Sequence, residues 1–188
     1  NLGAAAGKVI DEQHRVCIDD VNLEVISEEE AKKILGEGPK TKDTMIKDGT
    51  FVKGMEQWTE WHDANEADAK YEVANNEIHF TVNKTGSEDW KIQFKQENIK
   101  LEKDHYYKLV FDGKSDLERK VRATLQGGES RGYTHYAGEY FVTLGKDYQT
   151  YEHVFKMNES TDDKTSFQIC MGAVGSSINK THNMYFKD

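Results

Sequence analysis

The chain has 188 residues, of which 36% are hydrophobic and 11% aromatic, and it carries a formal net charge of -9. This length predicts one domain of ordinary size, which buries enough surface to be stable without metal or disulfide staples. The acidic balance excludes the basic stripes that nucleic-acid phosphates require, and no charge-free apolar run approaches the length of a membrane span. We therefore expect neither nucleic acid nor a membrane as a partner.

The start of the chain is a second copy of its end. Residues 2–4 and 14–20 match residues 171–173 and 182–188, with one residue of difference in the intervening loop. A period of about 169 residues is too long for a solenoid repeat and indicates whole domains in tandem. We therefore expect residues 1–26 to be the C-terminal strand of a preceding homologous module.

The repeat also predicts strand exchange. In the first copy, the alternating segment 21–26 continues the strand, whereas the second copy stops at Asp188. A sheet that lacks this continuation leaves the backbone of the adjacent strand without a hydrogen-bonding partner at that position. We expect residues 15–26 to pair there by strand addition, in their own chain or in a neighbouring module.

Residues 27–45 are predicted to link the two modules. Ser27 and Glu30 form a capping-box pattern, which predicts a short helix at the start of this linker. The only proline of the chain, Pro39, follows in a polar stretch. The remaining residues, 46–188, form the predicted domain.

Beyond Ile46 the pattern is one of short strands with turn signals between them, and no further helix is predicted. Apolar and polar residues alternate in six segments: 77–83, 90–95, 107–111, 121–126, 151–156 and 167–171. One apolar face per strand is typical of two antiparallel sheets packed face to face. The predicted fold class is therefore all-β, a jelly-roll β-sandwich of two antiparallel sheets.

Cysteine and histidine spacing does not favour a metal centre. Cys17 and Cys170 lie in different copies of the repeat, and the seven histidines show no HxH or HExxH spacing. We expect both cysteines to be buried as small hydrophobic residues, and a disulfide between them is the alternative.

The opening of the predicted domain resembles a known family. The segment 48–51 (DGTF), then Gly54, Trp58 and Trp61, and later Trp90 and the pair 171–172, stand in the order typical of family 4 carbohydrate-binding modules and their relatives in families 9 and 22. The resemblance covers residues 46–188 and, as the end of another copy, residues 1–26. It implies a sandwich with a cleft for a single β-glucan or xylan chain. It also implies attachment to a bacterial glycoside hydrolase that is secreted or held at the cell surface.

Four aromatic residues are candidates for contact with such a chain, because a pyranose ring presents an apolar face that stacks on flat aromatic surfaces. Trp58 matches a core tryptophan of the family, so packing is favoured there over ligand contact. Trp61 is three residues on, on the opposite face of a strand, and matches a cleft aromatic. Trp90 matches the rim of the cleft. Tyr133 lies in a polar loop that predicts either a lid or an ordinary loop anchor.

Four polar residues are candidates for hydrogen bonds to sugar hydroxyls. Alternation places Gln93, Arg122, Gln126 and Gln168 on the face opposite to their apolar neighbours. Planar amides and a guanidinium group suit bidentate hydrogen bonds to hydroxyls. The alternative for each one is a solvated position on the sheet.

An enzyme is the main competing class. A glycosidase needs two facing carboxylates, about 5 to 9.5 Å apart. The acidic residues of the chain show no such pair, and we expect the cluster between residues 56 and 68 to lie in a solvated loop. Gly-x-Ser-x-Gly is absent too. A non-catalytic binding module is therefore predicted, whereas a structural or adhesive sandwich stays open and a xylan or β-1,3-glucan ligand remains an alternative.

The resemblance also implies a structural calcium ion, although no cofactor is required. Carbonyl and carboxylate oxygens near the opening motif and the closing aspartate hold calcium in the family. Val52 stands where relatives often carry an acidic ligand. Asp48 and Asp188 are the remaining candidate ligands.

Overall fold

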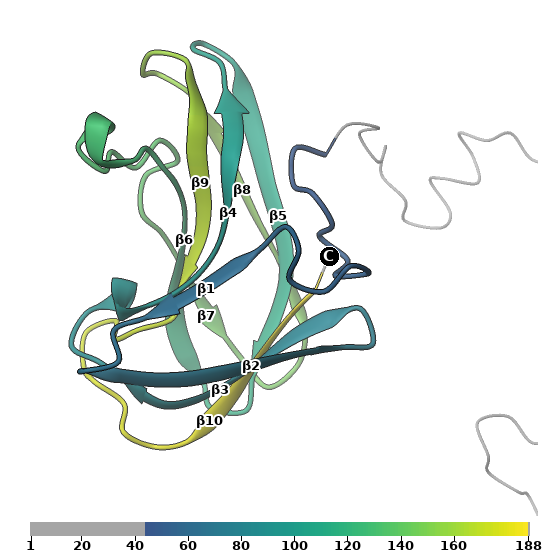
Figure 1. Cartoon of the computed structure of the whole chain (residues 1–188), viewed down its shortest axis with the longest axis vertical. Coiled ribbons are helices and arrows are strands. Elements are labelled where there is room, and N and C mark those ends of the chain that lie inside the picture. The colour runs from purple at the N-terminus through teal and green to yellow at the C-terminus, as the bar shows by residue number, and fades with distance from the viewer. Residues whose placement is uncertain (1–43, 188) are drawn as a thin grey trace, which may run out of the picture. The chain divides into compact units, whose positions relative to one another are not determined.

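A computed structural model describes residues 44–187 as two antiparallel sheets of five strands each (Figure 1). The strand order is β1-β4-β9-β6-β7 in one sheet, called sheet A, and β2-β3-β10-β5-β8 in the other, called sheet B. The all-β prediction is therefore confirmed. The predicted linker helix and the repeat segment 1–26 lie outside the described residues.

The two sheets have strands of 4 to 10 residues. Sheet A contains β1 (Thr59–His62), β4 (Ile92–Leu101), β9 (Asp162–Cys170), β6 (Arg119–Gln126) and β7 (Tyr140–Leu144). Sheet B contains β2 (Ala67–Ala74), β3 (Glu77–Thr85), β10 (His182–Lys187), β5 (Tyr106–Ser115) and β8 (Gln149–Lys156). Two short 3-10 helices, η1 (Asp89–Lys91) and η2 (Glu129–Arg131), interrupt the connecting loops.

The six segments predicted as strands all contain strands, β1 and β10 were indicated only by the placement of Trp61 and by the repeat, and β2 and β7 were not predicted. The last two are edge strands, and the first half of β2 (residues 67–70) alternates alanine with charged residues instead of large apolar ones. The expectation of a solvated loop between residues 56 and 68 was wrong for Glu60 and Asp68, which lie in β1 and β2. Hydrogen bonds to a neighbouring strand stabilise these polar segments in the extended conformation. The sequence of one segment does not show which strand it will pair with, so such strands are hard to predict.

The core lies between the sheets, and its centre is aromatic. The ring of Trp58 stacks on Phe94 at 4.5 Å between centroids, with 16° between the ring planes. Only 6% of Trp58 is exposed, and its indole N–H donates to the Asp48 carbonyl over 3.1 Å. The predicted core role of Trp58 is confirmed. Cys170 is also fully buried, as expected, but on the outer face of sheet A and not in this core, and Cys17 lies outside the described residues.

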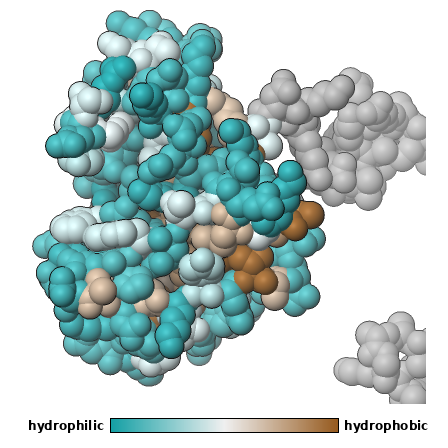
Figure 2. Space-filling view, in the orientation of Figure 1, coloured by the Kyte–Doolittle hydropathy of each residue, from teal (hydrophilic) through white to brown (hydrophobic). Residues whose placement is uncertain are grey.

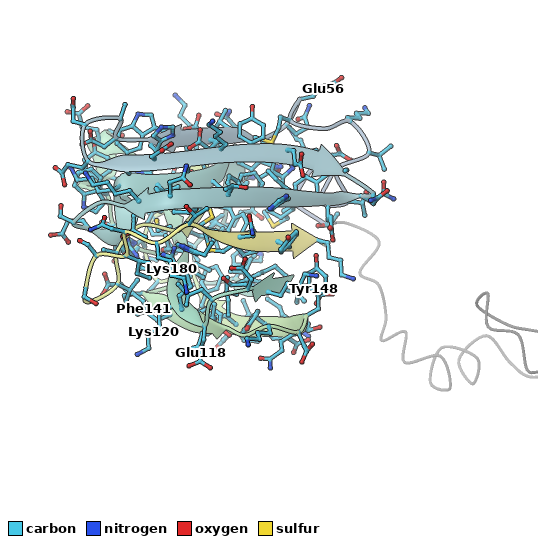
Figure 3. All side chains as sticks on the ribbon, turned by 90° about the horizontal axis from the view of Figure 1, so that it is seen from below. Glu56, Glu118, Lys120, Phe141, Tyr148 and Lys180 are labelled. Carbon is cyan, nitrogen blue, oxygen red and sulfur yellow. The ribbon has the colours of Figure 1, made fainter. Side chains whose placement is uncertain are left out.

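One charged residue is buried at the end of the core. Arg119 is 5% exposed, although Glu118 and Lys120 on either side of it project from the molecule (Figure 3). Its Nη2 donates to the carbonyls of Met171 and Gly172, over 2.5 and 2.6 Å. Burial lowers the pKa of Arg119 to about 10, so the guanidinium remains charged at neutral pH.

His182 completes this buried cluster and must be neutral to do so. Its Nε2 accepts from Arg119 over 2.7 Å, while Nδ1 donates to the Lys180 carbonyl over 2.7 Å. Burial lowers the pKa of His182, and the nearby guanidinium adds to the effect. An acceptor nitrogen cannot carry a proton, so protonation of this ring would break its bond to Arg119.

We expect the melting temperature to fall as the pH drops from about 7 to about 5. The folded-state pKa of His182 lies below that of the unfolded chain, so the unfolded state binds more protons in this range. The stabilisation is present above about pH 6.5 and is lost as the pH falls below that value. Thermal scans of the protein and of His182→Gln check this, because the variant should show a shallower pH dependence. Equal melting temperatures at both pH values would contradict the neutral assignment.

The surface on the side drawn in Figure 2 is mostly hydrophilic, and hydrophobic residues gather near residues 44–54 and the end of β10. Met45 and Val52 are exposed there, at 41% and 71%. In the part of the chain that the structure describes, no helix is both long and apolar enough to cross a bilayer.

Candidate functional site

A row of side chains crosses the outer face of sheet A. Strand register places five residues side by side, one from each strand of the sheet: Trp61, Gln93, Cys170, Arg122 and Phe141. All five point away from the core, since their neighbours along the strands point inward. The candidate residues of β1, β4, β6 and β9 are thus brought to one face.

Two tryptophans form an exposed aromatic pair at one end of this row. The rings of Trp61 and Trp90 lie 6.3 Å apart between centroids, with 16° between their planes. They are 43% and 42% exposed. Exposed tryptophan is unusual, because burying so large a ring is strongly favourable. This pair offers two nearly parallel apolar surfaces to a ligand.

The loop that carries Trp90 is held by a charged cluster. Lys91 is 7% exposed, and its Nζ contacts Asp63 over 2.7 Å and Glu66 over 2.8 Å. Hydrogen bonds from Lys91 lower the pKa of both carboxyl groups. The same ammonium lies 4.4 Å from the ring centroid of Trp90. The loop between β1 and β2 therefore fixes η1 and the tryptophan in it.

A glycine allows this loop to approach sheet A. The backbone N–H of Gly172 donates to the Asp89 carbonyl over 2.7 Å, and the N–H of Ala173 donates to the Glu88 carbonyl over 3.1 Å. A Cβ atom on Gly172 would lie 2.1 Å from the Glu88 oxygen. Any residue with a side chain would therefore push η1 away from the end of β9.

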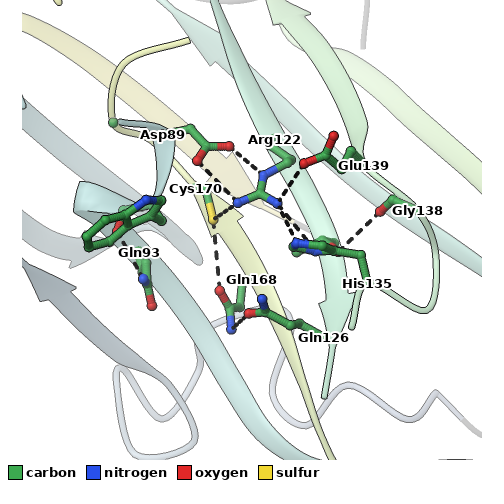
Figure 4. A network of polar contacts seen from close by, with 12 residues as sticks. Asp89, Gln93, Arg122, Gln126, His135, Gly138, Glu139, Gln168 and Cys170 are labelled. Atoms are coloured by element: carbon green, nitrogen blue, oxygen red, sulfur yellow. Dashed lines mark hydrogen bonds and ion pairs between the residues drawn. The ribbon is translucent and has the colours of Figure 1, made fainter. Parts of the chain in front are cut away.

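The predicted glutamines form two small hydrogen-bonded groups (Figure 4). Gln93 Nε2 donates to the Trp90 carbonyl over 2.9 Å. Gln168 Nε2 donates to Gln126 Oε1 over 2.9 Å, and Gln126 Nε2 in turn donates to the Tyr133 carbonyl over 3.0 Å. The amides thus link the strands of sheet A to both loops that carry candidate aromatic residues.

Arg122 lies on the expected face, but protein groups occupy its guanidinium. Only 5% of the residue is exposed. Nη2 donates to Asp89 over 3.2 Å and contacts the Cys170 sulfur at 3.8 Å, and Nε lies 2.5 Å from the second Asp89 oxygen, away from the axis of a good hydrogen bond. Nη1 contacts His135 at 3.0 Å and Glu139 at 3.5 Å. Arg122 therefore fixes both loops against the sheet.

Tyr133 lies in the loop between β6 and β7, which is anchored by another tyrosine. The Tyr136 hydroxyl donates to Asp162 over 2.8 Å, and this ring is only 8% exposed. Tyr133 is 56% exposed and adopts a positive φ of 54°. Tyr136, and not Tyr133, is therefore the residue that anchors this loop. Tyr133 is left exposed at the surface, where it can contact a ligand.

Several residues of this face were missed by sequence reasoning. Asp89, His135 and Glu139 surround Arg122, and Phe141 ends the row at 43% exposure. The first three lie outside strands, where alternation gives no direction to a side chain. The burial of segment 140–144 alternates, but its sequence, YFVTL, begins with three aromatic or apolar residues, so alternation of residue type did not single out Phe141.

The fit to calcium is poor among the described residues. The two carboxylate oxygens of Asp48 accept the backbone N–H groups of Val52 and Lys53, over 3.0 and 2.8 Å. Calcium takes about six to eight oxygen ligands. Within residues 44–187, no group of three or more histidine, cysteine, aspartate or glutamate side chains is arranged to hold a metal. Asp188 lies outside the described residues, so its role with Asp48 stays a prediction.

Comparison with known families identifies the family to which this sandwich belongs. A family model described as a carbohydrate binding domain, covering families 4 and 9, matches residues 43–180. The chain belongs to this family. It is therefore a non-catalytic module whose partner is a carbohydrate. No curated protein matches the chain significantly.

Solved structures share the fold of the module. One described as "CBM4 structure and function" aligns with a TM-score of 0.65 at 24% identity, over 76% of this chain and 96% of that one. The N-terminal cellulose-binding domain of Cellulomonas fimi β-1,4-glucanase C aligns at 0.57 and 16%, over 78% and 94%. TmCBM61, in complex with β-1,4-galactotriose, aligns at 0.51 and 15%, over 78% and 96%. At these identities the likeness establishes the β-sandwich fold.

Proposed function

We propose that the module binds a single β-glucan chain on the outer face of sheet A, with β-1,4 or mixed-linkage glucan preferred and xyloglucan as a further candidate. The observation that carries the proposal is the exposed, nearly parallel pair of Trp61 and Trp90. Successive sugar rings of an extended β-linked chain stack well on such surfaces. The amides of Gln93 and Gln126 supply donors and acceptors for the hydroxyl groups, and Gln168, which is 8% exposed, orients the Gln126 amide by a hydrogen bond.

The charges around this face favour a neutral polysaccharide. Arg122 is paired with Asp89, and Lys91 is paired with Asp63 and Glu66. Paired charges offer little attraction to a charged sugar, because each partner already neutralises the other. The exposed tryptophan pair also speaks against a purely structural or adhesive sandwich. Xylan and β-1,3-glucan remain the alternative ligands.

The proposed role of the module is to direct an attached glycoside hydrolase to plant cell-wall polysaccharide, at a bacterial cell surface or in secreted form. Affinity electrophoresis against soluble cellulose derivatives, mixed-linkage glucan, xyloglucan, xylan and laminarin tests the ligand. Strongest retardation by a β-1,4 or mixed-linkage glucan is expected. Retardation by xylan alone or by laminarin alone would show that xylan or β-1,3-glucan is the ligand instead. Retardation by none of these polysaccharides would refute the proposal.

Strand addition by residues 15–26 is a separate proposal about sheet B. The last described pair between β10 and β5 is Lys187 with Asp112, whereas β5 continues back to Tyr106 along β8. We expect deletion of residues 1–26 to lower the melting temperature by about 4 °C or more, equivalent to about 1–2 kcal/mol. Thermal scans of the full and shortened chains check this expectation. An unchanged melting temperature would contradict it.

A further inference from the structure

His135 connects the Tyr133 loop to the floor of sheet A. Its Nε2 lies 3.0 Å and its Nδ1 3.3 Å from Arg122 Nη1, and Nδ1 also lies 3.0 Å from the Thr124 hydroxyl (Figure 4). Thr124 Oγ1 in turn donates to the Gly138 carbonyl over 3.3 Å, at the far end of the same loop. An isolated β-bridge also joins His135 to Gln126. One imidazole thus lies where the loop meets β6.

These contacts require a neutral ring. A guanidinium only donates hydrogen bonds, so the ring nitrogen nearer to Arg122 Nη1, which is Nε2 at 3.0 Å against 3.3 Å for Nδ1, carries a lone pair and no proton. The Thr124 hydroxyl gives its proton to the Gly138 carbonyl, so its oxygen accepts from Nδ1 of His135. This pattern fits the neutral tautomer with its proton on Nδ1. A second proton would place two cations 3.0 Å apart.

The surroundings of the ring disfavour that second proton. Burial is the largest cause that lowers the pKa of His135, and Arg122 of β6 lowers it further. Glu139 of the loop and Asp89 of η1 oppose this effect, but both carboxylates are already engaged with Arg122. From β9, the thiol of Cys170 faces the same guanidinium and is neutral, because burial raises its pKa to about 12.

We propose that His135 is a positioning residue that holds Tyr133 at the sugar-binding face while its ring is neutral, and that mild acid releases this loop and weakens binding. The inference rests on the proposed function, since it adds regulation to the same face. Tyr133 lies two residues before His135, and its carbonyl already accepts a hydrogen bond from Gln126. The opposite anchor is the Tyr136 hydroxyl, which donates to Asp162 and stays protonated in this range, because the pKa of Tyr136 is raised to about 12.

The test separates loop release from ligand binding. Hydrogen exchange of the backbone amides of residues 128–138 is measured at about pH 7 and about pH 5, after correction for the intrinsic pH dependence of exchange. NMR titration of the histidine side chains gives the pKa and tautomer of His135 in the same samples. We expect protection of the loop to drop at the lower pH, together with protonation of His135. Neither measurement needs a sugar.

The matched variants are His135→Gln and His105→Gln. Glutamine can accept from Arg122 and donate to Thr124 but cannot gain a proton, so loop protection should become independent of pH. His105 lies at an exposed turn, and its side chain is 63% exposed, so its replacement should leave the pH dependence unchanged. Both variants keep His182, which separates loop release from any general loss of stability in acid.

Calorimetric titration with a β-glucan oligosaccharide that the module binds measures the effect of pH on affinity. We expect the affinity of the unaltered module to fall up to about tenfold between about pH 7 and about pH 5, which corresponds to one pKa unit of coupling. The affinity of His135→Gln should stay constant. A His135 that is protonated at neutral pH, or loop exchange that does not change with its protonation, would overturn the inference. Absence of sugar binding at every pH would instead refute the proposed function.

Discussion

Trp61→Ala and Trp90→Ala are each expected to weaken β-glucan binding by about 1–3 kcal/mol, by analogy with the stacking of bases on aromatic side chains. This corresponds to a loss of about 5- to 150-fold in affinity. Each ring presents one of the two nearly parallel surfaces of the exposed pair, and each is more than two-fifths exposed. Calorimetric titration with a β-glucan oligosaccharide measures the effect.

The control for these variants is Tyr106→Ala. Tyr106 is 73% exposed and lies in sheet B, so it is an aromatic residue of the same module outside the proposed site. Its replacement should leave the affinity unchanged. Thermal unfolding of all three variants shows whether the fold is intact. Unchanged affinity in both tryptophan variants would show that the outer face of sheet A is not the β-glucan-binding site.

Gly172→Ala is expected to reduce both affinity and stability, although residue 172 presents no side chain to a ligand. The added Cβ would meet the backbone of Glu88 and Asp89, at 2.1 Å and 2.7 Å from their oxygens. Backbone atoms cannot rotate away as a side chain can, so η1 must shift and carry Trp90 with it. We expect a loss of about 1–3 kcal/mol in the free energy of unfolding, as for overpacked sites. Affinity should fall at least about tenfold, since a displaced Trp90 loses its stacking contact.

Gly145→Ala is the matched control for this substitution. A Cβ atom at Gly145 would meet no atom within 4 Å, and this residue does not have a positive φ. Denaturant unfolding and calorimetric titration of the two variants check the expectation. A Gly172→Ala protein with unaltered affinity and stability would show that η1 tolerates the displacement, and that Trp90 is not held by this contact.

Alternation along single segments was enough to predict the sandwich and the direction of many side chains. In β4, Ile92 and Phe94 are buried and Gln93 between them is not, because successive residues of a strand point to opposite faces. The same rule, with the resemblance to the family, placed Trp58 inside and Trp61 outside. The weakly apolar β2 escaped this reasoning, since an edge strand depends on its neighbour more than on its own pattern.

The sequence by itself therefore determined the fold class and the face on which the candidate residues lie, whereas the tertiary structure decided how they are held. Arg122 pairs with Asp89, 33 residues away, and with His135 from another loop. Lys91 forms ion pairs with Asp63 and Glu66 only when β1 is paired with β4. The physical reason is that alternation is a local property of the backbone, but a hydrogen bond or ion pair requires two groups within about 3 to 4 Å. Packing of the sheets and loops alone brings such distant groups together.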